Sequence, residues 1–313
     1  MKGQVDTSWL YYRVFLGRAT DRTDHFIITT IARARSYQGI QSWFFLRYYE
    51  DGEHHLRLRL KPAASAYKEL GEYVQAVCTG GLSGVSELSP SDYRPMVYPP
   101  GLDPTAQNHT GDVRIEMFPY EPEYEKYGGP QGVALAESHF MASSEVAIDI
   151  LNDEMKGVYS RKTLAPLLMR LAYLMFAPQE SAEVFWSQYA KYWLGGDTPI
   201  AHDWRLRFFE KARELDAAGI PIFTPDSELP EAGAKQLHRW REGLGASLRQ
   251  YESGGILDRV ARSSLCSNFI HLMNNRLGIS LLEEAYLATL CEHAERRPSS
   301  LSPRASDFSA LGH

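Results

Sequence analysis

The sequence is poor in cysteine. Its 313 residues include three, Cys78, Cys266 and Cys291, and no two of them have CxxC spacing. An odd number of widely separated cysteines argues against a disulfide framework and against a structural zinc site. The sequence also lacks a run of about 18 apolar residues, which a membrane span requires, and its start lacks the apolar segment of a signal peptide. We therefore expect a cytoplasmic protein with free thiols.

Positive charge is not in excess either. Lys and Arg total 33 against 39 Asp and Glu, for a net charge of -6, which argues against binding nucleic acid through bulk charge. Familiar catalytic motifs are missing: there is no GxxxxGK[ST], no complete GxGxxG after a strand, no HExxH and no GxSxG. What is present is 44% apolar residues, enough for a sizeable core in one large domain or two small ones.

The first third of the chain alternates between strand and helix patterns. Short segments rich in aromatic or β-branched residues predict strands at 9–16, 42–49 and 112–118, and strict alternation predicts another at 54–60. Helical patterns cover 21–37 and 63–78, and the Gly/Ser/Pro-rich stretch 79–110 is interpreted as a loop. The order strand, helix, strand, strand, helix, strand is the ferredoxin-like βαββαβ pattern.

After Gly129 the pattern becomes helical. The predicted helices cover 131–155, 163–176, 180–193, 202–218, 228–253, 257–275 and 281–296. The Ser/Pro-rich end, 298–313, is expected to be a flexible tail. The sequence therefore predicts an α+β fold, with a ferredoxin-like sheet in residues 1–129. A helical part, 130–297, would pack on that sheet as a second domain or within one compact domain.

The segment HHLRLRL carries the most informative chemistry. Because side chains alternate along a strand, its leucines face a core, while the opposite face carries a histidine and a row of cations: His55, Arg57, Arg59 and Lys61. A solvated face is the commoner role of such a row. Two features favour binding instead. The preceding strand, SWFFLRYY, is aromatic on both faces, so we expect it to be central and covered, and the planar forks of arginine suit carboxylates or phosphates.

Two further segments are dense in polar groups. YEPEYEKYGGPQG follows the last predicted strand, with a tight turn and a helix start at Gly128-Gly129-Pro130. It is either a connector or, because three glutamates and three tyrosines crowd into eight residues, a functional loop. In a functional loop, Glu121, Glu123 and Glu125 would anchor the arginine row or supply a base. In NFIHLMNNRLG, the residues His271, Asn275 and Gly278 share one helical stripe with Arg276 beside it, so His271 is either a structural or a functional histidine.

These segments resemble the C-terminal elimination domain of lantibiotic dehydratases and its stand-alone relatives in thiopeptide biosynthesis. The resemblance rests on WLYYRVFLG, SWFFLRYYEDGEHHLRLRL, YEPEYEKYGG with AESHF following, and IHLMNNRLG, in family order over most of the chain. It implies one of two activities on a ribosomally made precursor peptide, neither of which uses a metal or a redox cofactor. One eliminates glutamate from glutamylated Ser or Thr, giving dehydroalanine or dehydrobutyrine. The other joins two dehydroalanines by a formal [4+2] cycloaddition, which forms a pyridine macrocycle and releases the leader peptide.

The resemblance implies that Arg57, Arg59 and His271 are the catalytic residues of an elimination. The departing carboxylate has a conjugate-acid pKa of about 4.3, so it needs no proton. It does need cations where its charge develops, as does the transient enolate, and His271 would act as base or proton carrier. Where the family pattern is TYxRExxRYGG, this chain has PYEPEYEKYGG, with Pro122 and Lys126 in place of the two arginines.

Other residues are expected to bind the substrate around this centre. They are His55, Lys61, Arg114, Tyr120, Glu123, Tyr127, Ser144 and Arg276, of which Arg114 is the candidate substitute for the missing arginines. In a cycloaddition, the tyrosines, Ser143, Ser144 and His271 would serve as proton donors instead.

The resemblance also implies partners. We expect a precursor peptide, leader and core, and for an elimination a separate glutamylating dehydratase. A third alternative is a non-catalytic leader-peptide-binding partner of such a dehydratase, which the loss of arginine at Pro122 favours. An exposed strand edge would suit leader binding by strand addition in each case.

Overall fold

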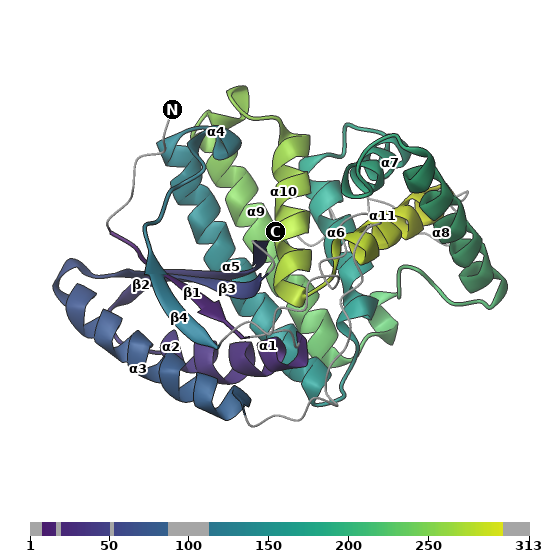
Figure 1. Cartoon of the computed structure of the whole chain (residues 1–313). Helices are drawn as coiled ribbons and strands as arrows, with labels where there is room; N and C mark the ends of the chain where they lie inside the picture. Colours follow the sequence, from purple (N-terminus) through teal and green to yellow (C-terminus); the bar gives the residue numbers. More distant parts are fainter. Residues whose placement is uncertain (1–7, 17–19, 51–52, 87–112, 297–313) are drawn as a thin grey trace.

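A four-stranded antiparallel sheet forms the first part of the protein. The computed structural model describes residues 8–16, 20–50, 53–86 and 113–296 (Figure 1). The strands are β1 (Leu10–Phe15), β2 (Ile40–Glu50), β3 (Glu53–Pro62) and β4 (Arg114–Phe118), in the order β2-β3-β1-β4. This is the strand order of a ferredoxin-like βαββαβ unit, so the predicted α+β fold is confirmed.

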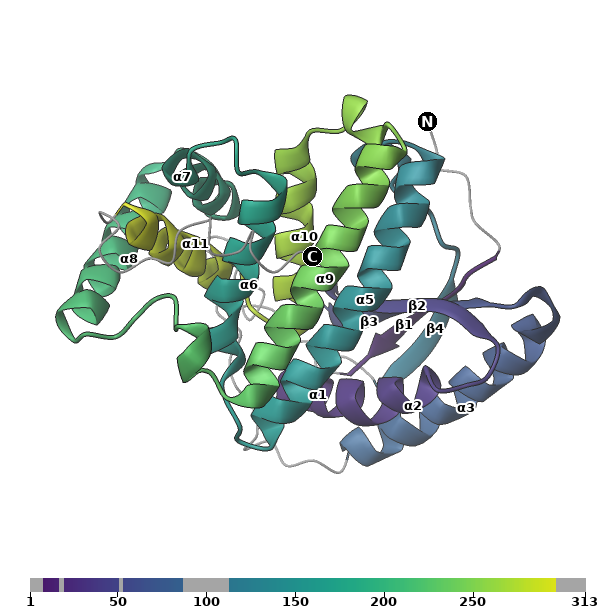
Figure 2. The same cartoon turned by 180° about the vertical axis from the view of Figure 1, so that it is seen from behind.

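Helices cover the apolar face of the sheet, on which Leu56, Leu58 and Leu60 are fully buried. The covering elements are α1 (Thr20–Phe26), the π-helical turn η1 (Ile27–Ile31), α2 (Ala32–Ala34), the 3₁₀ turn η2 (Ala64–Ala66) and α3 (Tyr67–Ser86) (Figures 1 and 2). The helix predicted over 21–37 is therefore one helical stretch that a π-turn interrupts.

The predicted loop at 79–110 is wrong for its first residues, because α3 continues to Ser86. Gly80 and Gly81 look like helix breakers in the sequence. A Cβ added to Gly81 would lie 2.2 Å from the hydroxyl oxygen of Thr30, so this glycine lets α3 approach η1 closely. The remainder of the predicted loop, 87–110, and the predicted tail, 298–313, lie outside the described residues.

The strand β2 is an edge strand, which corrects the expectation that its aromatic residues make it central. Two helices cover its outer edge, α5 (Pro130–Met155) and α10 (Arg262–Leu277). The Phe45 N–H donates to Ser144 Oγ at 3.4 Å, and the Asn275 side-chain amide bonds the N–H and C=O of Arg47 at 2.9 and 2.8 Å. Side chains thus take the place of a neighbouring strand, which explains why an edge strand is apolar on both faces.

The remainder of the described chain is helical, as predicted. Besides α5 and α10, the long helices are α6 (Arg161–Phe176), α7 (Ala182–Trp193), α8 (Pro199–Ala217), α9 (Glu231–Ser253) and α11 (Leu281–Glu295). Helices α5, α6, α9 and α10 pack together beside the sheet, whereas α7, α8 and α11 form a group at the far end (Figures 1 and 2). The 3₁₀ turn η6 (Ile256–Asp258) precedes α10, which therefore begins later than predicted. The division of the chain at residue 129 stays a prediction.

His139 connects three of these helices and is expected to make stability depend on pH. Its Nδ1 lies 3.0 Å from Ser247 Oγ, its ring stacks on Phe269 with centroids 4.0 Å apart, and burial lowers its pKa to about 3. An unfolded histidine has a pKa of about 6.5. Between these two values the unfolded state binds more protons, so the free energy of unfolding falls as the pH falls.

Between pH 7 and pH 5, wild type should lose about 2 kcal/mol more unfolding free energy than His139→Gln, whose side chain does not titrate. Urea unfolding of both proteins at the two pH values measures this difference. Equal losses in the two proteins would show that His139 is protonated as easily when folded as when unfolded.

Candidate active site

The segment after β4 brings two tyrosines to the candidate site. A single turn, α4 (Tyr124–Tyr127), ends at Gly128, whose φ of 83° is left-handed, and α5 begins at Pro130. The predicted turn and helix start are thus confirmed. A Cβ on Gly132 would lie 1.6 Å from the Tyr127 carbonyl oxygen, and the Gly132 carbonyl accepts a 2.8 Å bond from the Tyr251 hydroxyl. Close backbone packing therefore fixes the buried Tyr127.

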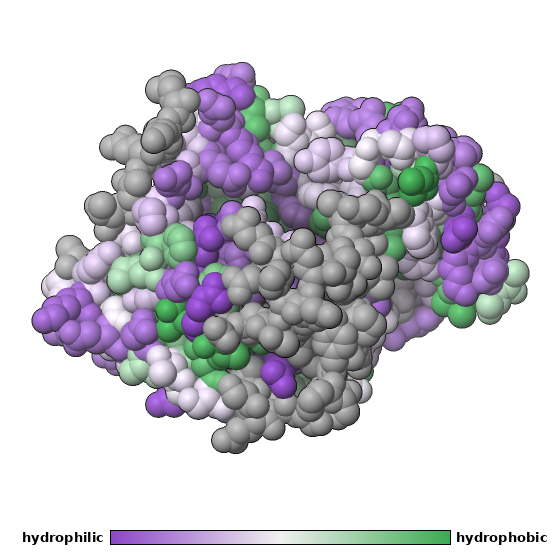
Figure 3. Space-filling view, in the orientation of Figure 1, coloured by the Kyte–Doolittle hydropathy of each residue, from purple (hydrophilic) through white to green (hydrophobic). Residues whose placement is uncertain are grey.

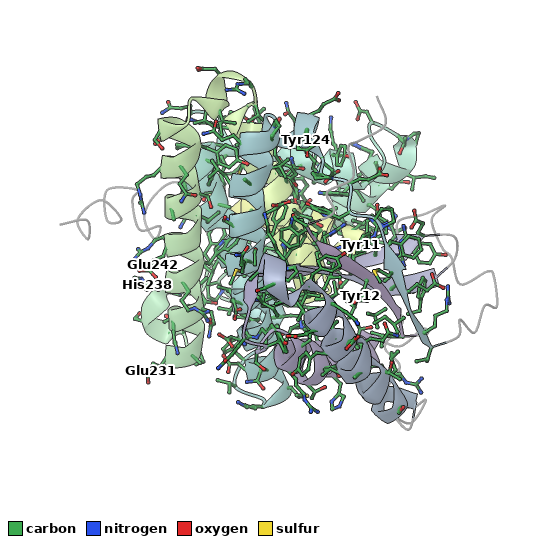
Figure 4. The ribbon with its side chains drawn as sticks, turned by 90° about the vertical axis from the view of Figure 1, so that its left-hand side faces the viewer. Tyr11, Tyr12, Tyr124, Glu231, His238 and Glu242 are labelled. Carbon is green, nitrogen blue, oxygen red and sulfur yellow. The ribbon has the colours of Figure 1, made fainter. Side chains whose placement is uncertain are left out.

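The predicted row of cations does lie on one face of the sheet. Arg57 and Arg59 of β3 stand opposite Arg13 and Tyr11 of β1. In Figure 4, Tyr11 lies on the side of the sheet toward α4, and Tyr12 lies on the other side. Sequence reasoning missed Arg13, although the alternation in LYYRVF places it on the same face as Tyr11.

Arg57 occupies the outer half of this face. Its guanidinium carbon lies 3.2 Å from the ring centroid of Tyr48, and its Nη2 donates to Glu50 Oε2 at 3.2 Å. The same Glu50 oxygen lies 2.7 Å from Arg13 Nη1, and Arg57 Nε donates to His55 Nε2 at 3.4 Å. With 15% of its side chain exposed, Arg57 does not point into bulk solvent.

Arg59 lies deeper, with 8% of its surface exposed. Its guanidinium carbon is 4.6, 5.2 and 5.1 Å from the ring centroids of Tyr11, Phe44 and Tyr120. Burial among these rings lowers the pKa of Arg59. Within the described part of the chain, no carboxylate forms an ion pair with it, and its buried Nε has no hydrogen-bond partner.

A second buried guanidinium comes from α10. Arg276 is fully buried; its Nε donates to Ser144 Oγ at 3.0 Å and its Nη1 to the Leu272 carbonyl at 2.9 Å. Its Nη2 has no partner among the residues that the structure describes. Burial lowers the pKa of Arg276 to about 9, and the charge of Arg59 adds to this lowering. The same two charges act on Tyr127, whose pKa is raised by burial.

Arg59 and Arg276 are two buried cations with which no described carboxylate forms an ion pair, although the charge of Glu123 acts on Arg59 from farther away. Buried charges in proteins are normally paired, because an unpaired charge costs several kcal/mol of desolvation. A carboxylate entering beside these donors would relieve that cost and would receive charge-assisted hydrogen bonds. The arrangement is therefore suited to binding an anion.

His271 lies on another side of α10. Its Nδ1 is 3.0 Å from Glu284 Oε2 on α11, its ring stacks on Trp193 of α7 with centroids 4.1 Å apart, and 22% of its side chain is exposed. No hydrogen bond or ion pair between described residues joins His271 to Arg57 or Arg59. His271 precedes Arg276 by five residues, so the two lie about 7.5 Å apart along the helix axis. Figure 3 shows the surface hollowed over α10, between the sides that carry α4 and α7.

The other members of the predicted helical stripe have structural roles. Asn275 bonds the backbone of Arg47, and a Cβ on Gly278, whose φ is 73°, would lie 3.0 Å from the Arg47 guanidinium carbon. Arg47 and Arg161 both bind the carboxylate of Asp24. These contacts lock α10 to β2, α1 and α6 and leave His271 as the chemically available group of the stripe.

Residues at the two ends of the cation row complete the predicted set. His55 is buried against Phe15, with ring centroids 4.9 Å apart. Arg114 stacks on the same Phe15 ring at 3.6 Å and lies 2.7 Å from Glu116. Lys61 lies at the opposite end of β3, with its ammonium nitrogen 5.6 Å from the centroid of the Trp9 ring. His55, Arg114 and Lys61 therefore lie at the two ends of the cation row and are not part of the buried pair Arg59 and Arg276.

The acidic residues of the 120–132 segment divide into two groups. Glu121, Glu123 and Glu125 are all exposed, and of the three Glu123 binds Lys126 at 3.5 Å and also acts on the charge of Arg59. The hydroxyl of Tyr120 donates to Glu137 Oε1 at 2.8 Å, and burial raises the pKa of Tyr120. Of the predicted set, the structure thus gathers Arg59, Arg276 and the two tyrosines with Ser144.

The three cysteines are buried and free, as predicted. In the described ranges, no group of three or more His, Cys, Asp or Glu is placed to bind a metal. No helix in the described part of the chain is both long and apolar enough to cross a membrane.

Comparison with known proteins establishes the family. The family model described as the C-terminal part of lantibiotic biosynthesis dehydratases matches residues 9–294. The chain therefore belongs to the lantibiotic dehydratase C-terminal family, as its sequence resemblance implied. A search of curated proteins gave no match.

Three solved structures share the fold. TbtD, the pyridine synthase from thiomuracin biosynthesis, is 16% identical with a TM-score of 0.65, covering 92% of this chain and 97% of its own. TsrL is 16% identical with a TM-score of 0.58, covering 93% and 94%. MibB, a tRNA-dependent lantibiotic dehydratase from Microbispora sp. 107891, is 20% identical with a TM-score of 0.59, covering 92% of this chain and 28% of its own. The chain thus spans about a quarter of MibB.

Proposed function

We propose that this protein is a tailoring lyase that eliminates glutamate from glutamylated Ser or Thr of a ribosomally made precursor peptide. The observation that carries the proposal is the buried pair Arg59 and Arg276, which has no described carboxylate partner. A glutamyl adduct brings two carboxyl groups: the esterified one becomes the leaving carboxylate, and the other is already a free carboxylate. Both suit arginine donors, whereas a cycloaddition between two neutral alkenes would give these cations no anion to bind.

The elimination requires two bonds to break. A base removes the proton from Cα, the electron pair of that C–H bond forms the Cα=Cβ double bond, and the Cβ–O pair leaves with glutamate as a carboxylate. Arg57, Arg59 and Arg276 are the candidate cations for the enolate and the departing group, and His271 is the candidate base. Each well-placed donor is worth about 3–4 kcal/mol of barrier in comparable enzymes.

A [4+2] cycloaddition that forms a pyridine macrocycle is the second candidate. It is favoured by Pro122 and Lys126 at the two arginine positions of the family pattern. The buried tyrosines Tyr120 and Tyr127 would serve it as hydrogen-bond donors, because burial raises the pKa of both hydroxyls and keeps them protonated. The likeness to a pyridine synthase extends over nearly all of that protein's length.

For the lead proposal, the partners are the precursor peptide and a separate glutamylating dehydratase that supplies the adduct. The three free, buried thiols suit the cytoplasm, where such peptides are made.

Incubating the purified protein with two synthetic peptides separates the alternatives. One peptide carries a glutamylated serine and the other carries two dehydroalanines. We expect the first to lose the mass of glutamic acid and the second to stay unchanged. Conversion of the second alone would establish the cycloaddition. Binding of either peptide without conversion would identify a leader-binding partner.

A further inference from the structure

The neighbourhood of His271 contains a carboxylate that nothing in the sequence singled out. Glu284 of α11 is fully buried, and its Oε2 lies 3.0 Å from His271 Nδ1. Its other oxygen, Oε1, accepts a hydrogen bond from the buried hydroxyl of Tyr189 on α7. Both oxygens are thus engaged, so the carboxylate has a fixed orientation relative to the imidazole.

In the part of the chain that the structure describes, His271 is the cationic partner of Glu284. The carboxylate of Glu284 forms no ion pair with any described residue other than His271. Burying an isolated carboxylate is costly, and a cation beside it offsets that cost. A positive charge that forms on His271 when it accepts a proton would therefore lie beside this carboxylate.

The backbone places Glu284 with little freedom. Gly278 ends α10 in a left-handed conformation, and Ser280 starts α11 with a capping box in which Ser280 and Glu283 bond each other's backbone N–H at 3.3 and 3.0 Å. Glu284 is the next residue. A three-residue link, 278–280, between two capped helix ends thus sets the distance between His271 and its carboxylate.

We propose that Glu284 is a positioning residue for His271. It accepts the Nδ1–H bond and so fixes the tautomer whose Nε2 is free to accept a proton, while Trp193 holds the plane of the ring. This inference rests on the proposed role of His271 as base in the elimination. Nε2 takes the Cα proton, the C–H electron pair forms the double bond, glutamate departs with the C–O pair, and the imidazolium later returns its proton to water.

Glu284→Gln tests this role, because glutamine keeps the size of the side chain and removes its charge. We expect kcat for glutamate release to fall about 10³-fold or more, as when the orienting carboxylate of a catalytic histidine is neutralised, with little change in KM. Tyr189→Phe should give a smaller loss, because the carboxylate keeps its bond to His271.

The surface pair His238 and Glu242 on α9 supplies a matched control. It has the same two residue types 3.2 Å apart, with both side chains exposed (Figure 4). Glu242→Gln should therefore leave kcat, KM and the melting temperature at their wild-type values.

The ¹⁵N NMR spectrum of the His271 ring decides the inference without any substrate. A spectrum of His271→Asn assigns its signals among those of the ten histidines. We expect the Nδ1–H tautomer to predominate in wild type and in Glu242→Gln, and to lose its preference in Glu284→Gln. An unchanged tautomer in Glu284→Gln would overturn the role of Glu284. Absence of glutamate release by wild type would overturn the proposed elimination instead, while the tautomer measurement would still stand.

Discussion

Replacing Arg276 with methionine is expected to abolish glutamate elimination and, at the same time, to raise the melting temperature. Burial lowers the pKa of Arg276 to about 9, because holding an unpaired charge in the core costs several kcal/mol. Methionine fills a similar space without that cost, and buried charges replaced in this way often stabilise a protein by about 1–4 kcal/mol. The loss of one donor to developing charge should slow turnover by about 10²–10³-fold.

The bonds that Arg276 makes do not alter this expectation. Ser144 Oγ still accepts from the Phe45 N–H, and the Leu272 carbonyl remains within α10. Arg213→Met on the exposed surface of α8 is the control, and we expect it to leave both quantities unchanged. Thermal unfolding and a glutamate-release assay compare the Arg276→Met and Arg213→Met variants with wild type. A lower melting temperature together with full activity would mean that Arg276 is a structural residue.

Gly132→Ala is expected to destabilise the protein by more than about 4 kcal/mol, which is exceptional for a single substitution. The new Cβ would lie 1.6 Å from the Tyr127 carbonyl oxygen. The backbone cannot relax easily there, because the Gly132 carbonyl is bonded to the Tyr251 hydroxyl and Gly128 next to Tyr127 is in a left-handed conformation. Tyr127 would have to leave its place beside Arg59 and Arg276.

Gly80→Ala is the matched control, since no atom lies within 4 Å of a Cβ added there. In the middle of α3, alanine should stabilise by up to about 1 kcal/mol. Chemical denaturation of the two variants measures the contrast. Equal changes in the free energy of unfolding would show that the contact at Gly132 is easily relieved.

Local sequence patterns were enough for most of the fold. The alternation in HHLRLRL correctly separated a leucine face from an arginine face, because strand geometry alone determines it. Local patterns could not predict that α3 continues past Gly80 and Gly81, nor that β2 lies at the edge of the sheet. Both depend on distant groups, namely Thr30 against Gly81 and the amide of Asn275 against β2.

The candidate site was predictable in part for the same reason. The row with Arg57 and Arg59 follows from strand alternation. His271 was a candidate because Asn275 and Arg276 lie near it on the same helix. Arg13 was within reach of the same alternation and was missed. The contact of Glu284 with His271 depends on how α10 and α11 pack, although the Ser280–Glu283 capping box in the sequence does place Glu284 in the first turn of a helix.

Binding of free glutamate tests most directly whether the buried guanidinium pair receives an anion. Isothermal titration calorimetry at low salt would compare wild type with Arg59→Met, Arg276→Met and Arg213→Met. We expect wild type and Arg213→Met to bind glutamate equally, and each of the other two variants to bind it at least about tenfold more weakly, the loss expected for one charge-assisted hydrogen bond. Equal affinity in all four proteins would contradict the assignment of Arg59 and Arg276 as the anion site.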